Sequence, residues 1–283
     1  MKEFGSVTGK VAACAAAYLV TFLATAGLVQ IVFPPPDIES AAGGITWVLT
    51  QMGLASLVLA AGLAIVGQGI RGSFAARSII LFVFFYISYG VTSAIEAHFF
   101  TTLAGMFSYY LPLSIVPAAV LAALTACLFD GTPPDDPTQR MLRSYVAGRS
   151  VFSWAWRLPA AWLAFPVIYI FFGLLVSPFV LEHYEQQENL RIPEPLLVVG
   201  IQFVRSALFL IATGPVLVAW SGSRRRLWGA LGLALFLIVG LAGLIQGPVF
   251  TMQLRIAHGL EILADSFVHA AALVLLLGRA VRR

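Results

Sequence analysis

Eight apolar stretches, each long enough to cross a lipid bilayer, constrain the fold of this chain more than any other feature. A spanning helix rises about 1.5 Å per residue and needs about 20 apolar residues. The stretches that qualify are 11–33, 45–70, 77–98, 109–129, 158–180, 196–220, 227–248 and 256–279. We therefore predict an all-α polytopic membrane protein with eight transmembrane helices.

The lysines and arginines predict how these helices are oriented. If the N-terminus is cytoplasmic, 14 of the 17 fall in cytoplasmic loops or termini, and Arg205 lies within a helix. Only Arg191 and Arg255 then lie outside. Basic residues concentrate on the cytoplasmic side of membrane proteins, so we expect both termini to be cytoplasmic.

The composition indicates where the protein resides and which partners it has. The chain is 60% hydrophobic and 11% charged, which leaves little mass for a soluble domain. Its net charge of +4 follows from the membrane orientation rule, so we expect no nucleic-acid partner. We predict a multi-pass protein of the cell inner (plasma) membrane in contact with membrane lipids. The sequence is compatible with a homo-oligomer and with a partner in a membrane complex.

A weak internal repeat divides the chain into two halves. A shift of 150 residues places Gly90–Thr101 on Gly240–Thr251, with Glu96 on Gln246. Each half contains four spans, so the two copies run parallel and are related by an axis along the membrane normal. We predict a first four-helix half at 1–130, a cytoplasmic or interfacial elbow at 131–157 and a second four-helix half at 158–283. The elbow's second part has the pattern of a short amphipathic helix, with Leu142, Tyr145, Val146, Phe152 and Trp156 between arginines.

The last span carries an unusual stripe of ionisable residues. His258, Glu261, Asp265 and His269 are spaced by three, four and four residues. At about 100° per residue, the four side chains fall within roughly 60° of one another on a helix. Ionisable groups inside a membrane are costly and usually face a bundle interior or a wet cavity. The stripe therefore indicates a site.

Polar residues of other spans fall at the same depth. Glu96 lies near the outer end of the third span, Arg205 is about nine residues below the outer surface in the sixth, and Gln246 ends the seventh. We expect a single asymmetric site where the eighth helix meets the outer ends of these three. His98 points away from Glu96 by about 200°, and His183 lies in an acidic outer loop. Both are therefore of second rank.

Three interpretations of this layer compete. The first is a zinc or iron site with His258, Glu261 and Glu96 as ligands, Asp265 and His269 being further ligands or supporting groups; haem on His258 or His269 is a variant of it. The second is a proton or ion pathway, which the almost purely apolar inner halves of the spans disfavour. The third is a structural network in which Arg205 pairs with Asp265 or Glu261.

Family resemblance adds little to this interpretation. Two parallel halves of four spans are similar in architecture to haem A synthase. That family places histidine pairs on the even-numbered spans of both halves, whereas the second, fourth and sixth spans here contain none. The paired-glutamate motif of intramembrane CAAX-type proteases is absent, as are the GxSxG, HExxH and Walker motifs.

The function that we predict is a membrane enzyme with an outward-facing intramembrane polar site, metal-dependent and acting on a lipid-like or small apolar substrate. In this interpretation His258, Glu261 and Glu96 bind the metal, Asp265 and Arg205 are catalytic, and His269 contacts a cofactor. The alternatives are a small-solute or proton-coupled transporter that uses the same residues, and a non-catalytic subunit of a membrane complex.

Overall fold

The computed structural model describes residues 6–33, 44–102, 105–129, 138–187, 190–247 and 250–279. This part of the chain is helical apart from turns and two isolated β-bridges. Its elements in chain order are α1 (Val7–Val32), α2 (Gly44–Gly67), α3 (Phe74–Phe85), the π-helix η1 (Tyr86–Val91), α4 (Thr92–Phe100), α5 (Met106–Leu128), α6 (Thr138–Ala147), α7 (Val151–Glu185), α8 (Pro195–Ala219), α9 (Arg224–Leu235), the π-helix η2 (Phe236–Leu241), α10 (Ala242–Gln246) and α11 (Met252–Leu277).

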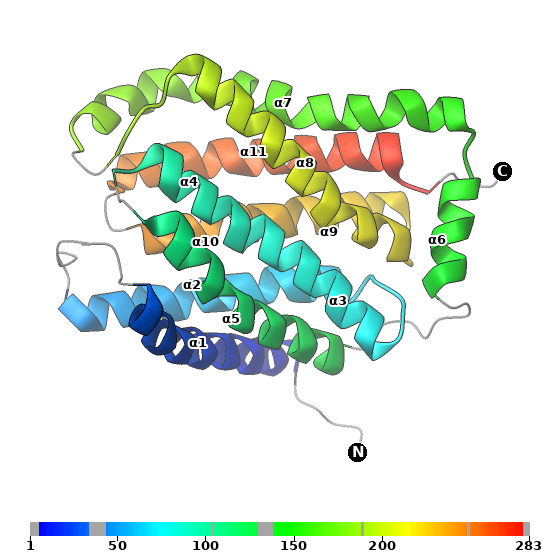
Figure 1. Ribbon diagram of the computed structural model, residues 1–283, viewed down its shortest axis with the longest axis horizontal. Helices are drawn as coiled ribbons and strands as arrows, with labels where there is room; N and C mark the ends of the chain where they lie inside the picture. The colour runs from blue at the N-terminus through cyan, green and yellow to red at the C-terminus, as the bar shows by residue number, and fades with distance from the viewer. Residues whose placement is uncertain are drawn as a thin grey trace.

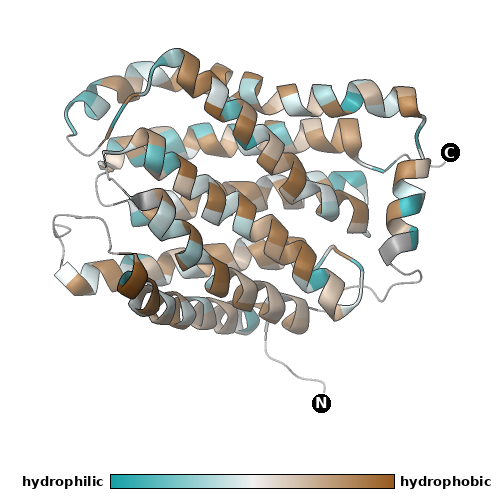
Figure 2. Ribbon diagram, in the orientation of Figure 1, coloured by the Kyte–Doolittle hydropathy of each residue, from teal (hydrophilic) through white to brown (hydrophobic). Residues whose placement is uncertain are grey.

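Eight spans in the described residues are long and apolar enough to cross a membrane, as predicted, and they fit a multi-pass integral membrane protein. Two of them are composite, because α3, η1 and α4 form the third and α9, η2 and α10 form the seventh. Figure 2 shows that hydrophobic residues dominate the lengths of the spans, whereas hydrophilic ones gather near helix ends and in α6.

Hydroxyl side chains determine where several helices begin. Ser73 Oγ accepts a hydrogen bond from the N–H of Ala76 at 3.3 Å, and Ser223 Oγ accepts one from Arg226 at 3.2 Å. Thr251 caps α11 in the same way. Each cap satisfies a backbone donor that has no partner within its helix. The helices therefore start three to four residues earlier than the apolar runs that predicted them.

The fifth span differs most from its prediction. It was expected at 158–180, but α7 runs from Val151 to Glu185. Ser150 caps its start, and three prolines lie inside the helix without ending it. One correction follows, because Phe152 and Trp156 belong to α7 instead of the short amphipathic helix. The helix is continuous across residues 157 and 158.

The helices pack as two groups of four, which meet through the second and third spans of one group and the sixth and seventh spans of the other. In the first group α1 packs on α2 and α5, and α3 packs on α5; in the second, α7 packs on α8 and α11, and α9 packs on α11. Between the groups α3 packs on α8, and α2 packs on α9. Figure 1 shows these spans running side by side in alternating directions.

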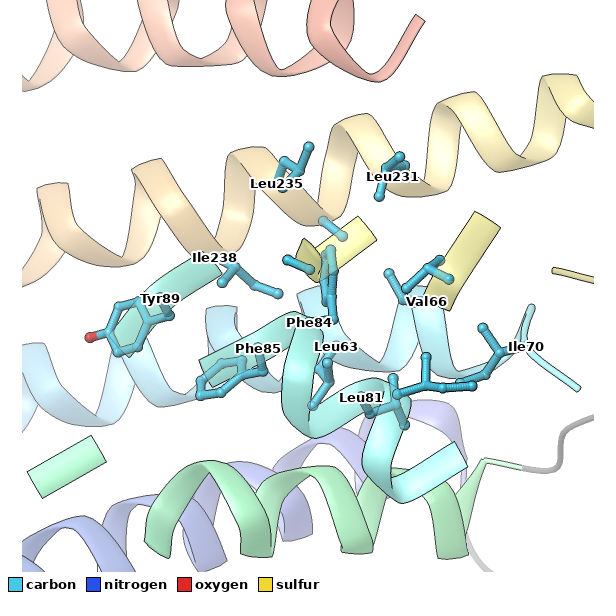
Figure 3. Packing of buried hydrophobic residues seen from close by; sticks show 14 of the residues in the cluster. Leu63, Val66, Ile70, Leu81, Phe84, Phe85, Tyr89, Leu231, Leu235 and Ile238 are labelled. Atoms are coloured by element: carbon cyan, nitrogen blue, oxygen red, sulfur yellow. The ribbon is translucent and has the colours of Figure 1, made fainter. Parts of the chain in front are cut away.

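The core lies where the two groups meet. Leucine, isoleucine, valine and phenylalanine side chains of α2, α3, α9 and the two π-helices interdigitate there (Figure 3). Phe84, Phe85, Leu63, Leu81 and Leu231 are fully buried. Since lipid tails are as apolar as these side chains, close van der Waals packing holds such helices together.

The third and seventh spans have matching architecture. The bounds of α3 and η1 differ from those of α9 and η2 by 150 residues. Beside them, Arg71 N–H donates to the carbonyl of Ala219 and Ser221 N–H donates to the carbonyl of Gly69, both at 2.8 Å. Arg71 and Ser221 are equivalent under the 150-residue offset, and so are Gly69 and Ala219. Each half therefore makes the same hydrogen bond to the other half. Such reciprocal contacts are typical of a two-fold axis.

Helix α6 attaches to the end of α11. Tyr145 Oη donates to the carbonyl of Leu277 at 2.5 Å, and Arg149 donates to the carbonyl of Gly278. Arg149 also stacks on the ring of Trp154, 4.9 Å from its centroid. Burial raises the pKa of the Tyr145 phenol, which keeps it a hydrogen-bond donor. The start of the predicted elbow, before Thr138, lies outside the described residues.

Arginines gather at this end of the bundle, which we call the basic end and define by Arg71, Arg149, Arg157, Arg224 and Arg279. Arg157 donates to the carbonyl of Leu276 at 2.8 Å, and Arg224 donates to that of Gly278 at 3.0 Å. The last carbonyls of a helix have no partner within it, so these contacts satisfy the end of α11.

Candidate functional site

The structure brings all six predicted site residues to one cavity of about 370 Å³. Glu96 reaches it from α4 and Arg205 from α8, and α11 contributes the stripe of His258, Glu261, Asp265 and His269. The cavity lies toward the end of the bundle opposite the basic end. It also borders α10 through Gln246, as the predicted layer requires.

Arg205 is the central cation of this cavity. Its Nη2 lies 2.6 Å from Glu96 Oε1, and its Nη1 donates to Gln202 Oε1 at 3.2 Å. The guanidinium also lies near the rings of Phe165, Tyr169 and Phe209, at 5.4 to 5.9 Å from their centroids. Arg205 is 4% exposed and Glu96 41%. The predicted pairing of Arg205 with Asp265 or Glu261 is therefore wrong, because its ion-pair partner is Glu96.

His258 and Glu261 form a second polar pair, one turn apart on α11. His258 Nδ1 lies 2.7 Å from Glu261 Oε2, and its Nε2 lies 3.1 Å from Tyr184 Oη. Glu261 thereby fixes the orientation of the imidazole ring. A carboxylate on one nitrogen and an exchangeable hydroxyl on the other is an arrangement suited to general acid–base chemistry.

Asp265 and His269 lie deeper along α11 and have fewer partners. Asp265 is 8% exposed and accepts one hydrogen bond, from Ser266 Oγ at 3.4 Å. The His269 ring packs against Phe165 and Phe209, with centroids 5.0 and 5.6 Å away. Its Nε2 is buried and has no hydrogen-bond partner within the described residues.

Tyrosines complete the wall, and most of them were missed from the sequence. Tyr169 and Tyr184 come from α7, whose contribution was not predicted, and Tyr110 comes from α5. Tyr110 Oη donates to Tyr89 Oη at 3.3 Å, and Tyr89 Oη donates to Gln246 Oε1 at 3.2 Å. Aromatic residues are frequent in membrane spans, so no pattern distinguished these from packing residues. Tyr89 alone had a signal, the helical spacing it shares with Glu96.

The π-helices shape one side of the cavity. A π-turn inserts a residue into a helix and often occurs at functional sites. Tyr89 of η1 and Gly240 of η2 both line the cavity. A Cβ atom at Gly240 would lie 2.5 Å from Ile262, so the absence of a side chain lets α11 approach closely. Just after η1, Thr92 Oγ1 of α4 donates to the carbonyl of Ile87 in η1 at 2.7 Å.

Arg255 fixes the rim of the cavity. It donates to the carbonyls of Leu244, Ile245, Gly247 and Phe250. These carbonyls lie at the end of α10 and just beyond it. The arginine therefore satisfies a helix terminus and holds the segment that leads into α11.

The residues predicted to bind a metal do not form a ligand set in this arrangement. Both ring nitrogens of His258 have partners, and Glu96 is paired with Arg205 instead of joining His258 and Glu261. Across the residues that the structure describes, no group of three His, Cys, Asp or Glu side chains is placed to hold a metal ion. Zinc or iron binding, and haem on His258 or His269, stay predictions.

The two remaining histidines lie outside the cavity. His98 is exposed and packs edge-on against Phe99 and Phe107, in agreement with its predicted direction. His183 was expected in a solvated loop, but it belongs to the last turn of α7 and its Nδ1 is buried.

No protein-family model, curated protein or solved structure matches this chain.

Proposed function

We propose that this protein is an outward-facing membrane enzyme that binds a small amphipathic molecule in the cavity and acts on it by proton transfer. The observation that carries the proposal is the convergence of six ionisable side chains and four tyrosines on one cavity whose remaining wall is mostly apolar. A few convergent polar groups in an apolar pocket are typical of small-molecule sites. The polar groups would hold the head of the ligand and the aromatic wall its apolar part.

His258 is the candidate general base or acid. Glu261 orients its ring through Nδ1, which leaves Nε2 to exchange protons with Tyr184 or with a bound ligand. An imidazole held by a carboxylate on its far nitrogen is a common catalytic arrangement. Arg205 and Asp265 are assigned to ligand binding.

The orientation is also proposed. If the basic end faces the cytoplasm of a bacterial inner membrane, both termini are cytoplasmic and the cavity opens outward. The support is the placement of arginines at the end opposite the cavity, where they bind the last carbonyls of α11. Membrane lipids are then the surroundings of the protein. A homo-oligomer or a complex partner stays a prediction.

We further propose that the two four-helix halves are copies of one ancestral unit. The 150-residue offset between the third and seventh spans, the reciprocal hydrogen bonds at Gly69 and Ala219, and the matching pattern of helix pairs support it. The halves have diverged at the cavity, where Glu96 has Gln246 as its counterpart. One polar site in place of two follows from that divergence.

Packing below the cavity favours an enzyme over a transporter. On α11 the residues after His269 that face the bundle are Ala270, Leu273, Val274 and Leu277, all buried. A solute path to the basic end would need polar or water-accessible groups in this layer.

A substitution that fills the cavity tests the proposal. Gly243 lines the cavity, and a Cβ there would meet no atom within 4 Å. Gly243→Leu is therefore expected to keep the fold and to abolish binding of 1-hexanol, measured by equilibrium dialysis of labelled ligand against purified protein. Gly229→Leu is the matched control, since Gly229 has equal space but does not line the cavity. Equal hexanol binding by both variants and the unaltered chain would refute the proposal.

A further inference from the structure

Asp265 is the carboxylate of the cavity that has no cationic partner. Glu96 pairs with Arg205 and Glu261 with His258, at 2.6 and 2.7 Å. In the described part of the chain, no Lys, Arg or His nitrogen lies within 4.0 Å of the Asp265 carboxylate. A buried carboxylate without such a partner is costly. It therefore needs a counter-ion or a proton.

The surroundings of Asp265 suit an organic cation. Phe165, Tyr169 and Phe209, which also lie against the Arg205 guanidinium, line the same cavity. Aromatic faces attract ammonium groups, most strongly where the contact excludes water. His269, one turn below Asp265, offers a buried Nε2 without a hydrogen-bond partner. The cavity thus combines a carboxylate that has no ion-pair partner within 4.0 Å among the described residues, aromatic faces and an unused imidazole nitrogen.

An anionic ligand fits this cavity less well. Among the described residues that line the cavity Arg205 is the one arginine, and both terminal nitrogens of its side chain are already engaged, with Glu96 and Gln202. Three carboxylates, on Glu96, Glu261 and Asp265, line the cavity. An added anion would have to displace Glu96 from Arg205 while facing the other two.

We infer that the ligand of the cavity is an amphipathic amine whose ammonium group binds the carboxylate of Asp265 and whose apolar part packs against the aromatic wall. This inference rests on the proposed function and names its substrate class. At about 30 Å³ per water-sized group, 370 Å³ holds roughly a dozen non-hydrogen atoms. A primary amine with a chain of about six carbons fits that volume.

Three probes with the same six-carbon tail test the inference: n-hexylammonium, 1-hexanol and hexanoate. Equilibrium dialysis against the purified full-length protein, with empty micelles subtracted, gives a Kd for each. We expect hexylammonium to bind the unaltered chain at least about tenfold more tightly than hexanol, and hexanoate to bind more weakly than either. Asp265→Asn, which keeps the size of the side chain, is expected to abolish the preference and to retain hexanol binding.

The control is Glu182→Gln, which removes an exposed carboxylate of α7 outside the cavity and should leave the order of the probes unchanged. Hexanol or hexanoate binding as tightly as hexylammonium would overturn the amine inference, as would a preference that survives in Asp265→Asn. Either result leaves the proposed function standing if Gly243→Leu still blocks hexanol. No binding of any probe overturns both. If Asp265→Asn does not fold, the order of the three Kd values on the unaltered chain still tests the amine inference.

Discussion

Glu96→Gln is expected to lower the free energy of unfolding by about 3 kcal/mol, because it leaves the Arg205 guanidinium buried without a counter-ion. Arg205 is 4% exposed, and Glu96 is its ion-pair partner, at 2.6 Å. Its contacts with three aromatic rings and Gln202 remain, but they do not neutralise the charge. Reversible unfolding in mixed micelles measures the change.

Removing the arginine of this pair should lower the free energy of unfolding by less than removing the glutamate does. Arg205→Met leaves Glu96 alone, but that side chain is 41% exposed and can retain solvent contact. We expect the double variant Glu96→Gln/Arg205→Met to be more stable than Glu96→Gln, since it removes the unpaired charge. Equal costs for the two single variants, or no recovery in the double variant, would show that Arg205 does not depend on Glu96.

Gly69→Ala is expected to destabilise the contact between the two helix groups by about 3 kcal/mol. A Cβ atom at Gly69 would lie 1.9 Å from a ring atom of Trp220, which is 5% exposed. The ring cannot move away freely, because Ile70 and Trp220 form a β-bridge and Ser221 N–H donates to Gly69. The backbone segments around Gly69 and Trp220 would have to move apart. Unfolding in mixed micelles again gives the change.

The matched control for this prediction is Gly53→Ala, in the interior of α2. A Cβ there meets no atom within 4 Å, so the higher helix propensity of alanine should stabilise the protein by about 0.5–1 kcal/mol. In a Trp220→Leu background, Gly69→Ala should cost less than about 1 kcal/mol, because the ring that it meets is gone. A cost that is unchanged in that background would place the strain elsewhere.

The number and order of the spans were predictable because bilayer thickness imposes a length on each apolar run. The ends were less predictable. Ser73, Ser223 and Thr251 extend their helices through hydrogen bonds that hydropathy does not register. The last residues of α7, up to Glu185, are mostly polar and follow the apolar run. Their composition is typical of a loop, so the sequence did not predict that the helix continues through them.

The candidate site was likewise predictable in part. The stripe on α11 was predictable, since helical spacing places its four side chains on one face whatever surrounds them. Their partners were not, because partner choice depends on how helices are rotated against each other. Arg205 pairs with Glu96 of α4, and Tyr184 joins His258 from α7. The π-turns within the third and seventh spans, which change the direction of the following residues, have no known signal in this sequence.

Labelling of a cysteine at position 243 shows whether an outward-facing, water-accessible cavity binds an amphiphile. Gly243→Cys, in a chain with Cys14→Ser and Cys127→Ser, is treated in intact cells with a membrane-impermeant thiol reagent. We predict labelling from the outside and slower labelling in the presence of hexylammonium or hexanol. Labelling only after the cytoplasmic side is exposed, or a rate that neither amphiphile changes, would contradict the account.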